Sequence, residues 1–318
     1  MTRAVAPPTP AALDAAAAVI GARLAPTPLV PAPALAPDAH LKLETLQPTG
    51  SFKVRGALAA LAGAGPGARV VTASAGNHGL GVAWAAAALG VEAVVVVPET
   101  ASPAKLAALA SLPIEVVRHG RGYDEAEAHA LALAAQGARY VSPYNDTDVI
   151  AGQATLGREL DAQLAGAPVR VVCALGGGGL GSGLGLWAAG RREATVVGVE
   201  AERSPAFTAA LAAGAIAPIE PGETLADGLG GNLEPGSATF PLVRDHVAAV
   251  VTVSETEIEE AIRFLARAHG VVAEGAGAVA AAGVLAGRVP RGEGALVVVV
   301  SGRNIALERL ARVLAPGV

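Results

Sequence analysis

The sequence is short of several residue types, and each shortage excludes a class of protein. Cys173 is the only cysteine among 318 residues, so no disulfide can form within the chain and a reducing, cytoplasmic location is expected. Charged residues make up only 16% of the chain and the net charge is −5, which argues against a nucleic-acid partner. The N-terminal segment predicts a helix that starts near Thr9, because prolines and Asp14 do not suit a signal peptide.

Membrane insertion is also disfavoured. The longest uncharged run, residues 171–190, is long enough to cross a bilayer, but it contains eight glycines. We therefore expect a strand, a glycine loop and the start of a helix here, and no membrane partner.

Short β-branched runs alternate with segments rich in Ala and Leu. Nearly continuous apolar strands predict burial on both faces, and the alternation predicts an α/β fold with parallel sheets. The predicted strands are Arg69–Ala73, Ala93–Val97, Ile114–Arg118, Arg139–Ser142, Val169–Leu175, Thr195–Glu200, Val250–Val253 and Ala295–Val300. The helix candidates are Gly79–Leu89, Tyr123–Gln136, Val149–Leu164, Glu255–Ala268 and Gly275–Leu285.

Three predicted strands end in polar or glycine-rich loops that open helices: SAGNHG after Ala73, GGGGLGSG after Leu175, and SGRN after Val300. Ligands in open α/β sheets bind beyond the carboxyl ends of strands. We therefore expect these loops to hold one ligand from several sides.

The glycine row at 176–183 predicts an anion site, because its backbone N–H groups and the following helix end attract phosphate. The same row satisfies G-x-G-x-x-G through Gly176, Gly178 and Gly181, and Glu200 follows the next strand. An NAD-dependent oxidoreductase is therefore one interpretation of these residues.

Lysine is scarce, with only three against twenty arginines. A site that keeps lysine in such a chain can require an amine able to lose its proton, which arginine cannot do. Lys53 lies between Phe52 and Val54, an apolar setting that lowers an amine's pKa and favours Schiff-base chemistry. Lys105 is expected on an exposed helix, and Lys42 is expected to be structural.

The chain resembles the fold-type II pyridoxal-phosphate enzymes, specifically the serine/threonine dehydratase and serine racemase family. The similar motifs occur in order over nearly the whole chain, which makes the match more specific than any one glycine pattern. They are TPL at 27–29, KLE at 42–44, PTGSFKVRGA at 48–57, SAGNHG at 74–79, PYND at 143–146, VIAGQATLGREL at 149–160, GGGGLGSG at 176–183, ETLADGL at 223–229, EGAGAVAAAG at 274–283 and SGRN at 301–304.

This resemblance implies roles for individual residues. Lys53 would hold pyridoxal 5′-phosphate and remove the Cα proton of the substrate, Asn77 would hydrogen-bond the ring oxygen, and Ser301 would face the pyridine nitrogen. The remaining cofactor contacts would come from Phe52 and from the phosphate loop, Gly176, Gly177, Gly178, Gly179 and Leu180. The substrate carboxylate would meet the loop of Ser74, Ala75, Gly76 and His78.

Three departures from the family pattern refine the prediction. Ala75 stands where racemases place a serine that protonates Cα, so elimination is favoured over racemisation. Glu200 has its place in the family's cation site, but Ala206 replaces a later acid, so no metal ion is expected. Arg303 replaces the usual glycine after SG, and it is either a surface residue or a selector of acidic substrates.

The resemblance implies two α/β domains with open parallel sheets and the cofactor in the cleft between them, as in the tryptophan synthase β-like fold. Residues 66–145 would form a small domain inserted in a larger one made of 1–65 and 146–318. The expected enzyme is a lyase, a dehydratase that converts L-threonine, L-serine or a related β-hydroxy amino acid to a 2-oxo acid and ammonia. A homodimer or homotetramer without a C-terminal regulatory domain is expected.

The alternatives within the same family are an amino-acid racemase and a hydroxyaspartate ammonia-lyase. Outside it stand the NAD-dependent oxidoreductase and a non-catalytic binding protein for small solutes. Both of these leave Lys53 without a role, and the oxidoreductase also leaves the SAGNHG and SGRN loops unexplained.

Overall fold

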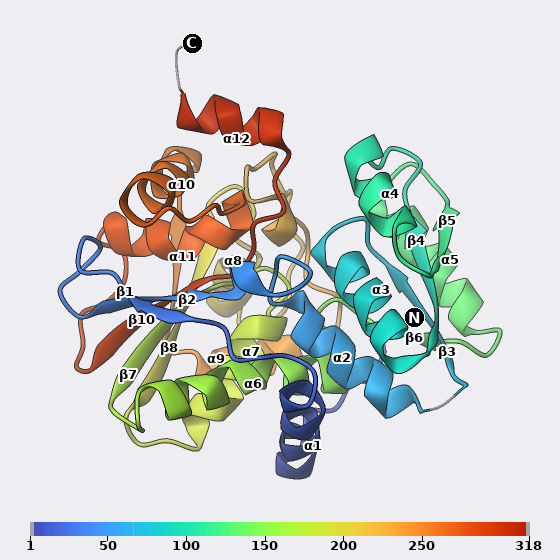
Figure 1. Cartoon of the computed structure of the whole chain (residues 1–318), viewed down its shortest axis with the longest axis horizontal. Coiled ribbons are helices and arrows are strands. Elements are labelled where there is room, and N and C mark those ends of the chain that lie inside the picture. The colour runs from blue at the N-terminus through green and yellow to red at the C-terminus, as the bar shows by residue number, and fades with distance from the viewer. Residues whose placement is uncertain (1–2, 66, 316–318) are drawn as a thin grey trace.

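The computed structural model describes residues 3–65 and 67–315. Two sheets lie beside each other, each covered by helices on both faces, so the predicted α/β fold class is confirmed (Figure 1). The larger sheet has the strand order β1-β2-β10-β7-β8-β9, and the smaller sheet has the order β5-β4-β3-β6. All neighbouring strands pair in parallel except β1 and β2.

All eight predicted strands are present, with ends that differ by a few residues. The larger sheet contains β1 (Leu29–Pro31), β2 (Ala39–Leu43), β7 (Val169–Ala174), β8 (Ala194–Ala201), β9 (Ala249–Val253) and β10 (Ala295–Val300). The smaller sheet contains β3 (Arg69–Ala73), β4 (Glu92–Val97), β5 (Glu115–Arg118) and β6 (Arg139–Tyr140).

The helices around the larger sheet explain why its central strands are apolar on both faces. On one face, α11 (Gly275–Leu285) packs on β7, β8 and β10, with α10 (Glu255–His269) and α12 (Leu307–Leu314) beside it. On the other face lie α6 (Thr147–Gln163), α7 (Gly179–Ala189) and α9 (Thr239–His246). The valines of β7 and β10 are therefore buried from both sides.

The smaller sheet has the same layered arrangement. One face is covered by α5 (Tyr123–Ala134), and the other by α3 (Asn77–Leu89) with α2 (Lys53–Ala64) and α4 (Pro103–Ala110). Because α2 packs on both α3 and α6, it lies between the two sheets (Figure 1). The remaining elements are α1 (Pro10–Gly21), η1 (Glu44–Leu46), α8 (Ala206–Ala213) and η2 (Asp227–Leu229).

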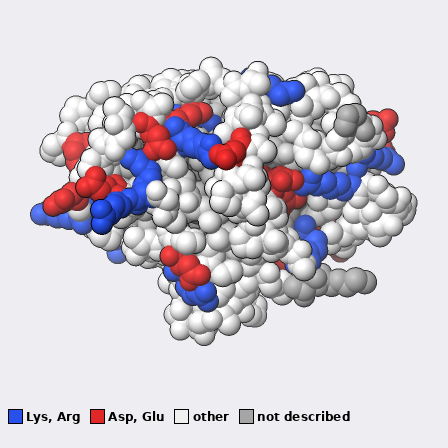
Figure 2. Space-filling view, turned by 90° about the horizontal axis from the view of Figure 1, so that it is seen from below, with Lys and Arg blue, Asp and Glu red and all other residues white. Residues whose placement is uncertain are grey.

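The predicted N-terminal helix is confirmed. Thr9 caps α1 by accepting a hydrogen bond from the backbone of Ala12, and Pro10 occupies the first helical position, which suits its fixed φ. No helix within residues 3–65 and 67–315 is both long and apolar enough to cross a membrane. The face drawn in Figure 2 mixes acidic and basic groups and shows no extended basic surface.

Candidate active site

Lys53 begins α2, and its amine is turned to the segment that connects β6 to α6. The Nζ atom donates a hydrogen bond to the backbone oxygen of Pro143 at 2.8 Å and lies 5.1 Å from the ring centre of Phe52. Burial lowers the pKa of Lys53 to about 8, although the carboxylate of Glu274 opposes this shift. With this pKa, roughly a tenth of the amine is unprotonated and nucleophilic at pH 7, far more than for an ordinary lysine.

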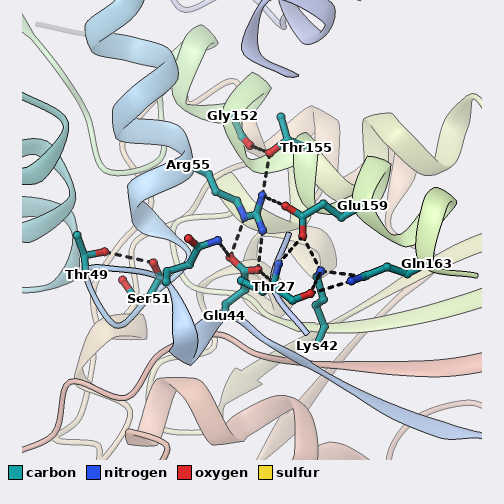
Figure 3. Close-up of polar contacts among 11 residues, drawn as sticks. Thr27, Lys42, Glu44, Thr49, Ser51, Arg55, Gly152, Thr155, Glu159 and Gln163 are labelled. Atoms are coloured by element: carbon teal, nitrogen blue, oxygen red, sulfur yellow. Dashed lines mark hydrogen bonds and ion pairs between the residues drawn. The ribbon is translucent and has the colours of Figure 1, made fainter. Parts of the chain in front are cut away.

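A buried ionic network holds α2 in place two residues beyond Lys53 (Figure 3). The Arg55 guanidinium donates to both oxygens of Glu44 and to Glu159, and none of the Arg55 or Glu44 side chain is exposed. Lys42 donates to Glu159 at 2.6 Å and to Gln163 at 2.9 Å. The expectation that Lys42 is structural is confirmed, because its amine is wholly engaged in this network.

The glycine row leaves a set of backbone donors free where α7 begins. Within the described residues, the N–H groups of Gly176–Gly179 and Leu180 make no hydrogen bond. Gly178 has φ +88°, a backbone conformation that other residues rarely adopt. The side chains of Tyr144 and Phe207 pack so closely on this row that Cβ atoms there would overlap them. The unpaired donors and the positive helix end form a site for an anion.

A second set of donors lies at the start of α3. In the described part of the chain, the backbone N–H groups of Ala75, Asn77 and His78 have no hydrogen-bond partner, whereas that of Gly76 donates to Ser74 Oγ at 3.2 Å. His78 is buried, with its Nε2 atom 3.1 Å from a backbone oxygen. Burial and the nearby Lys53 lower the pKa of His78 to about 3, so its ring is neutral at pH 7.

Ser301 lies directly beside the residues that precede Lys53. Its backbone oxygen accepts a hydrogen bond from Phe52 N at 3.0 Å, and Ser51 bridges to Gly302. The Ser301 hydroxyl donates to the backbone oxygen of Ala276 at 3.3 Å. The prediction that the SGRN loop opens a helix is wrong, because α12 starts only at Leu307.

The structure brings the predicted residues together through a continuous chain of contacts. Pro143 holds the Lys53 amine and the adjacent Tyr144 packs on the glycine row, while the Asn77 amide reaches the C-terminal part of the chain, where Ser301 lies. The loops after β3, β7 and β10 are therefore linked to one another by contacts in the folded chain.

Two residues of this site were missed by the sequence reasoning. Glu274, the residue before α11, accepts a hydrogen bond from Asn77 Nδ2 at 2.6 Å. Asn304 Nδ2 donates to Asn77 Oδ1 at 2.6 Å. Both residues lie in motifs that had been noted, EGAGAVAAAG and SGRN, but their spacing along the chain does not reveal that they meet Asn77.

Glu200 is engaged by protein donors. Its two carboxylate oxygens accept hydrogen bonds from the backbone of Phe207 and from the backbone and hydroxyl of Thr208, at 2.6–2.8 Å. Burial raises the pKa of this carboxyl group, although these three hydrogen bonds oppose the shift. The carboxylate oxygens that a ribose or a cation would contact are thus already bound by residues at the start of α8. No group of three His, Cys, Asp or Glu side chains in the described regions is arranged for a metal ion.

A model of the family described as pyridoxal-phosphate dependent enzymes matches residues 21–302, and the chain belongs to this family. The site fits the cofactor, because unpaired donors at the start of α7 suit its phosphate and an amine of lowered pKa suits its aldehyde. The predicted family and cofactor are confirmed, and the protein is a pyridoxal-phosphate enzyme.

Relatives with curated names support this assignment. The chain is 41% identical over 285 residues to the L-threonine ammonia-lyase of Thermotoga maritima, covering 88% of this chain and 70% of that protein. It is 37% identical over 283 residues to the catabolic L-threonine dehydratase of Escherichia coli, covering 87% of this chain and 85% of that one.

Solved structures agree with the sequence relatives. The T.th. threonine deaminase is similar with a TM-score of 0.86 and 38% identity, covering 94% of this chain and 99% of that one. Maize serine racemase is similar with a TM-score of 0.89 and 27% identity, covering 96% and 97%. An eliminating enzyme and a racemase therefore share this fold, and the side chains of the site must determine which reaction occurs. The threonine ammonia-lyase and dehydratase relatives confirm the predicted lyase class and fold type.

Proposed function

We propose that this protein is an ammonia-lyase that removes water from L-threonine or L-serine and yields a 2-oxo acid and ammonia. The Lys53 amine carries the proposal, because it is partly buried, has a pKa lowered to about 8 and lies in the site that contains the free donors of α7. The names of the relatives from Thermotoga maritima and Escherichia coli support threonine as the substrate.

The proposed roles follow from the chemistry of each residue. When bound, the cofactor supplies an electron sink for the charge that develops at the substrate Cα. Gly176–Gly179 and Leu180 hold its phosphate, and Phe52 packs beside it. The free N–H groups at the start of α3 bind the substrate carboxylate, with the positive end of that helix adding to the attraction. Lys53 accepts the Cα proton in its unprotonated form.

Two features favour elimination over racemisation. The Ser301 hydroxyl donates to the backbone oxygen of Ala276 at 3.3 Å, and by turning from that oxygen it would face the pyridine nitrogen. A neutral partner does not keep that nitrogen protonated, so a β-leaving group departs readily. Ala75 offers only a methyl group in the SAGNHG loop, so it cannot deliver a proton to Cα from the opposite face. The similarity to maize serine racemase makes racemisation the second candidate.

A panel assay tests the reaction. Keto-acid release is measured from L- and D-threonine, L- and D-serine and threo-3-hydroxyaspartate, with chiral analysis of the remaining substrate. We expect keto acid from L-threonine or L-serine and no change of configuration. Borohydride treatment followed by peptide mass analysis should locate the cofactor on Lys53, and Lys53→Ala should abolish turnover. A colourless protein that takes up no pyridoxal phosphate would contradict the proposal.

A variant of Arg303 tests whether this residue selects an acidic substrate. Its side chain is exposed, and it follows Gly302, which packs against Glu274. If Arg303 selects an acidic side chain, Arg303→Gly should lower the rate with hydroxyaspartate relative to threonine. An unchanged ratio would leave Arg303 as a surface residue.

We also propose that residues 66–145 form a small domain inserted between 1–65 and 146–318, with the site in the cleft. The strand order supports this division, because β3 to β6 form a sheet of their own. Limited proteolysis should cut between these units before it cuts within them.

We further propose a cytoplasmic homodimer or homotetramer. A single buried cysteine suits a reducing compartment, and self-association is part of the proposal that the measurement below decides. Light scattering after size exclusion measures the oligomeric state, and a monomer at working concentration would refute the oligomer.

A further inference from the structure

The Asn77 side chain is held from both ends by other side chains. Asn304 Nδ2 donates to the backbone oxygen of Thr49 at 2.8 Å and to Asn77 Oδ1 at 2.6 Å. Asn77 Nδ2 in turn donates to Glu274 Oε1 at 2.6 Å. These residues come from the loop before α2, the start of α3, the start of α11 and the loop after β10, so the amide joins four parts of the chain.

The direction of every hydrogen bond in this chain follows from donor chemistry. A backbone oxygen can only accept, so Asn304 must present its NH₂ group to Thr49. The second hydrogen of that NH₂ group then reaches Asn77, which must present its oxygen. The Asn77 NH₂ group therefore faces Glu274, and one of its two hydrogens is left for another acceptor. The orientation of the Asn77 amide is thus fixed by Thr49 through Asn304.

Glu274 is unusual for a carboxylate in this position. It is only 6% exposed, and although it immediately precedes α11, its side chain makes no capping hydrogen bond to that helix. Burying a carboxylate that does not cap a helix costs free energy of folding. The side chain is instead directed to Asn77, and its carboxylate occupies the space beside Gly302 that a Cβ atom there would fill.

Charged groups from three other elements influence Glu274. Asp227 of η2 raises its pKa, whereas Lys105 of α4 and Lys53 of α2 lower it. Burial has the largest effect, and the pKa of Glu274 is raised to about 7. The carboxylate therefore changes charge in the neutral range beside the amine that would bind the cofactor.

We propose that Glu274 and Asn304 are positioning residues that hold the Asn77 amide so that its remaining N–H group serves the ring oxygen of the cofactor. The inference rests on the proposed function, because Asn77 needs a fixed orientation only if that oxygen lies beside it. Asn304 sets the orientation, and Glu274 both secures it and places a titratable negative charge next to the site.

Asn304→Ala tests the orientation. The visible spectrum of the bound cofactor is titrated with pH, and kcat and KM are measured separately. Loss of a donor to the ring oxygen should move the spectral midpoint upward by about one pH unit and lower kcat roughly 10- to 100-fold, with KM much less affected. Asn304→Asp, of the same size but with only acceptors when ionised, should act in the same direction and guards against a folding defect in the alanine variant.

Glu274→Gln separates the hydrogen bond from the charge. Glutamine can accept the same bond, so kcat should stay within about 5-fold, whereas loss of the negative charge should move the spectral midpoint downward. Asp227→Asn is the matched control, since it removes a nearby but half-exposed carboxylate that forms an ion pair with Lys105. It should move the midpoint much less than Glu274→Gln.

The outcomes separate the two proposals. If the wild-type protein takes up no pyridoxal phosphate, the proposed function fails and the positioning role fails with it. If the wild-type protein binds the cofactor but the Asn304 and Glu274 variants keep its spectral midpoint, the positioning role alone is overturned. Shifts of the same sign in Asn304→Ala and Glu274→Gln would also overturn it, because the two roles require opposite signs.

Discussion

Replacing Arg55 by methionine should destabilise the whole protein. Methionine keeps an unbranched apolar stem but is shorter than arginine and removes the guanidinium from the network of Figure 3. Glu44, which is fully buried, would then lose its ion-pair partner, and Glu159 would keep only Lys42. A buried charge that loses its partner is far more costly than an exposed one.

The magnitude follows from the contacts. Arg55 donates three hydrogen bonds of 2.6–2.8 Å to carboxylates, but Glu44 would keep donors from Thr27 and Gln47. Breaking a buried pair in this way costs about 3–5 kcal/mol. With an unfolding entropy of about 2.1 cal/mol/K per residue over 318 residues, about 4 kcal/mol lowers the Tm by roughly 6 °C.

Differential scanning calorimetry measures this effect, and the chain offers a matched control. Arg69 and Glu115 form an ion pair of 2.8 Å whose side chains are 51% and 57% exposed. Arg69→Met should therefore cost about 1 kcal/mol or less, a shift of about 2 °C at most. If Arg55→Met melts within the range of Arg69→Met, the buried network does not stabilise α2 as we infer.

Three further predictions concern the site. Only the unprotonated amine attacks an aldehyde, so the apoprotein should capture pyridoxal phosphate faster as pH rises. The midpoint of this rise should lie near the lowered pKa of Lys53, about 8. A midpoint near 10.5, the ordinary pKa of a lysine, would show that burial does not lower the pKa of this amine. Gly177→Ala should weaken cofactor binding roughly 10- to 100-fold in equilibrium dialysis, because its methyl group would overlap the Tyr144 ring. Gly222→Ala, where the methyl group meets only ordinary contacts, should bind normally, and equal affinity in the two variants would be evidence against this view. Because the start of α8 engages both oxygens of Glu200, a strong chelator should change neither kcat nor Tm, and a loss of either on chelation would show that a cation is bound.

The sequence predicted the central strands well and the edge of the larger sheet poorly. Runs such as Val169–Ala174 and Ala295–Val300 are β-branched and buried on both faces, so packing and local preference agree. The three residues of β1 include Pro31 and pair antiparallel at an edge, where a proline is tolerated but leaves no strand signal. The helix that begins at Lys53 was also not predicted, because GSFKVRG resembles a loop and its helical conformation depends on packing against α3 and α6.

The candidate site was predictable where residues act directly and unpredictable where they act through others. Lys53 and the glycine row have chemistry that can be inferred from the residues themselves, whereas the role of Asn77 is implied by the family resemblance. Glu274 and Asn304 contact Asn77 across 197 and 227 residues of sequence, and only the folded chain brings them together. The buried network around Arg55 was likewise invisible, except that Lys42 was expected to be structural.

The Lys53 amine donates its hydrogen bond to the main chain of Pro143 and not to a side chain. The acceptor is a main-chain oxygen, so no side-chain replacement at position 143 can delete it. That oxygen belongs to the stretch of chain that leaves the smaller sheet and enters α6, so any rotation of one sheet against the other would carry the acceptor with it. The position of the Lys53 amine therefore depends on how the smaller sheet is oriented relative to the larger one.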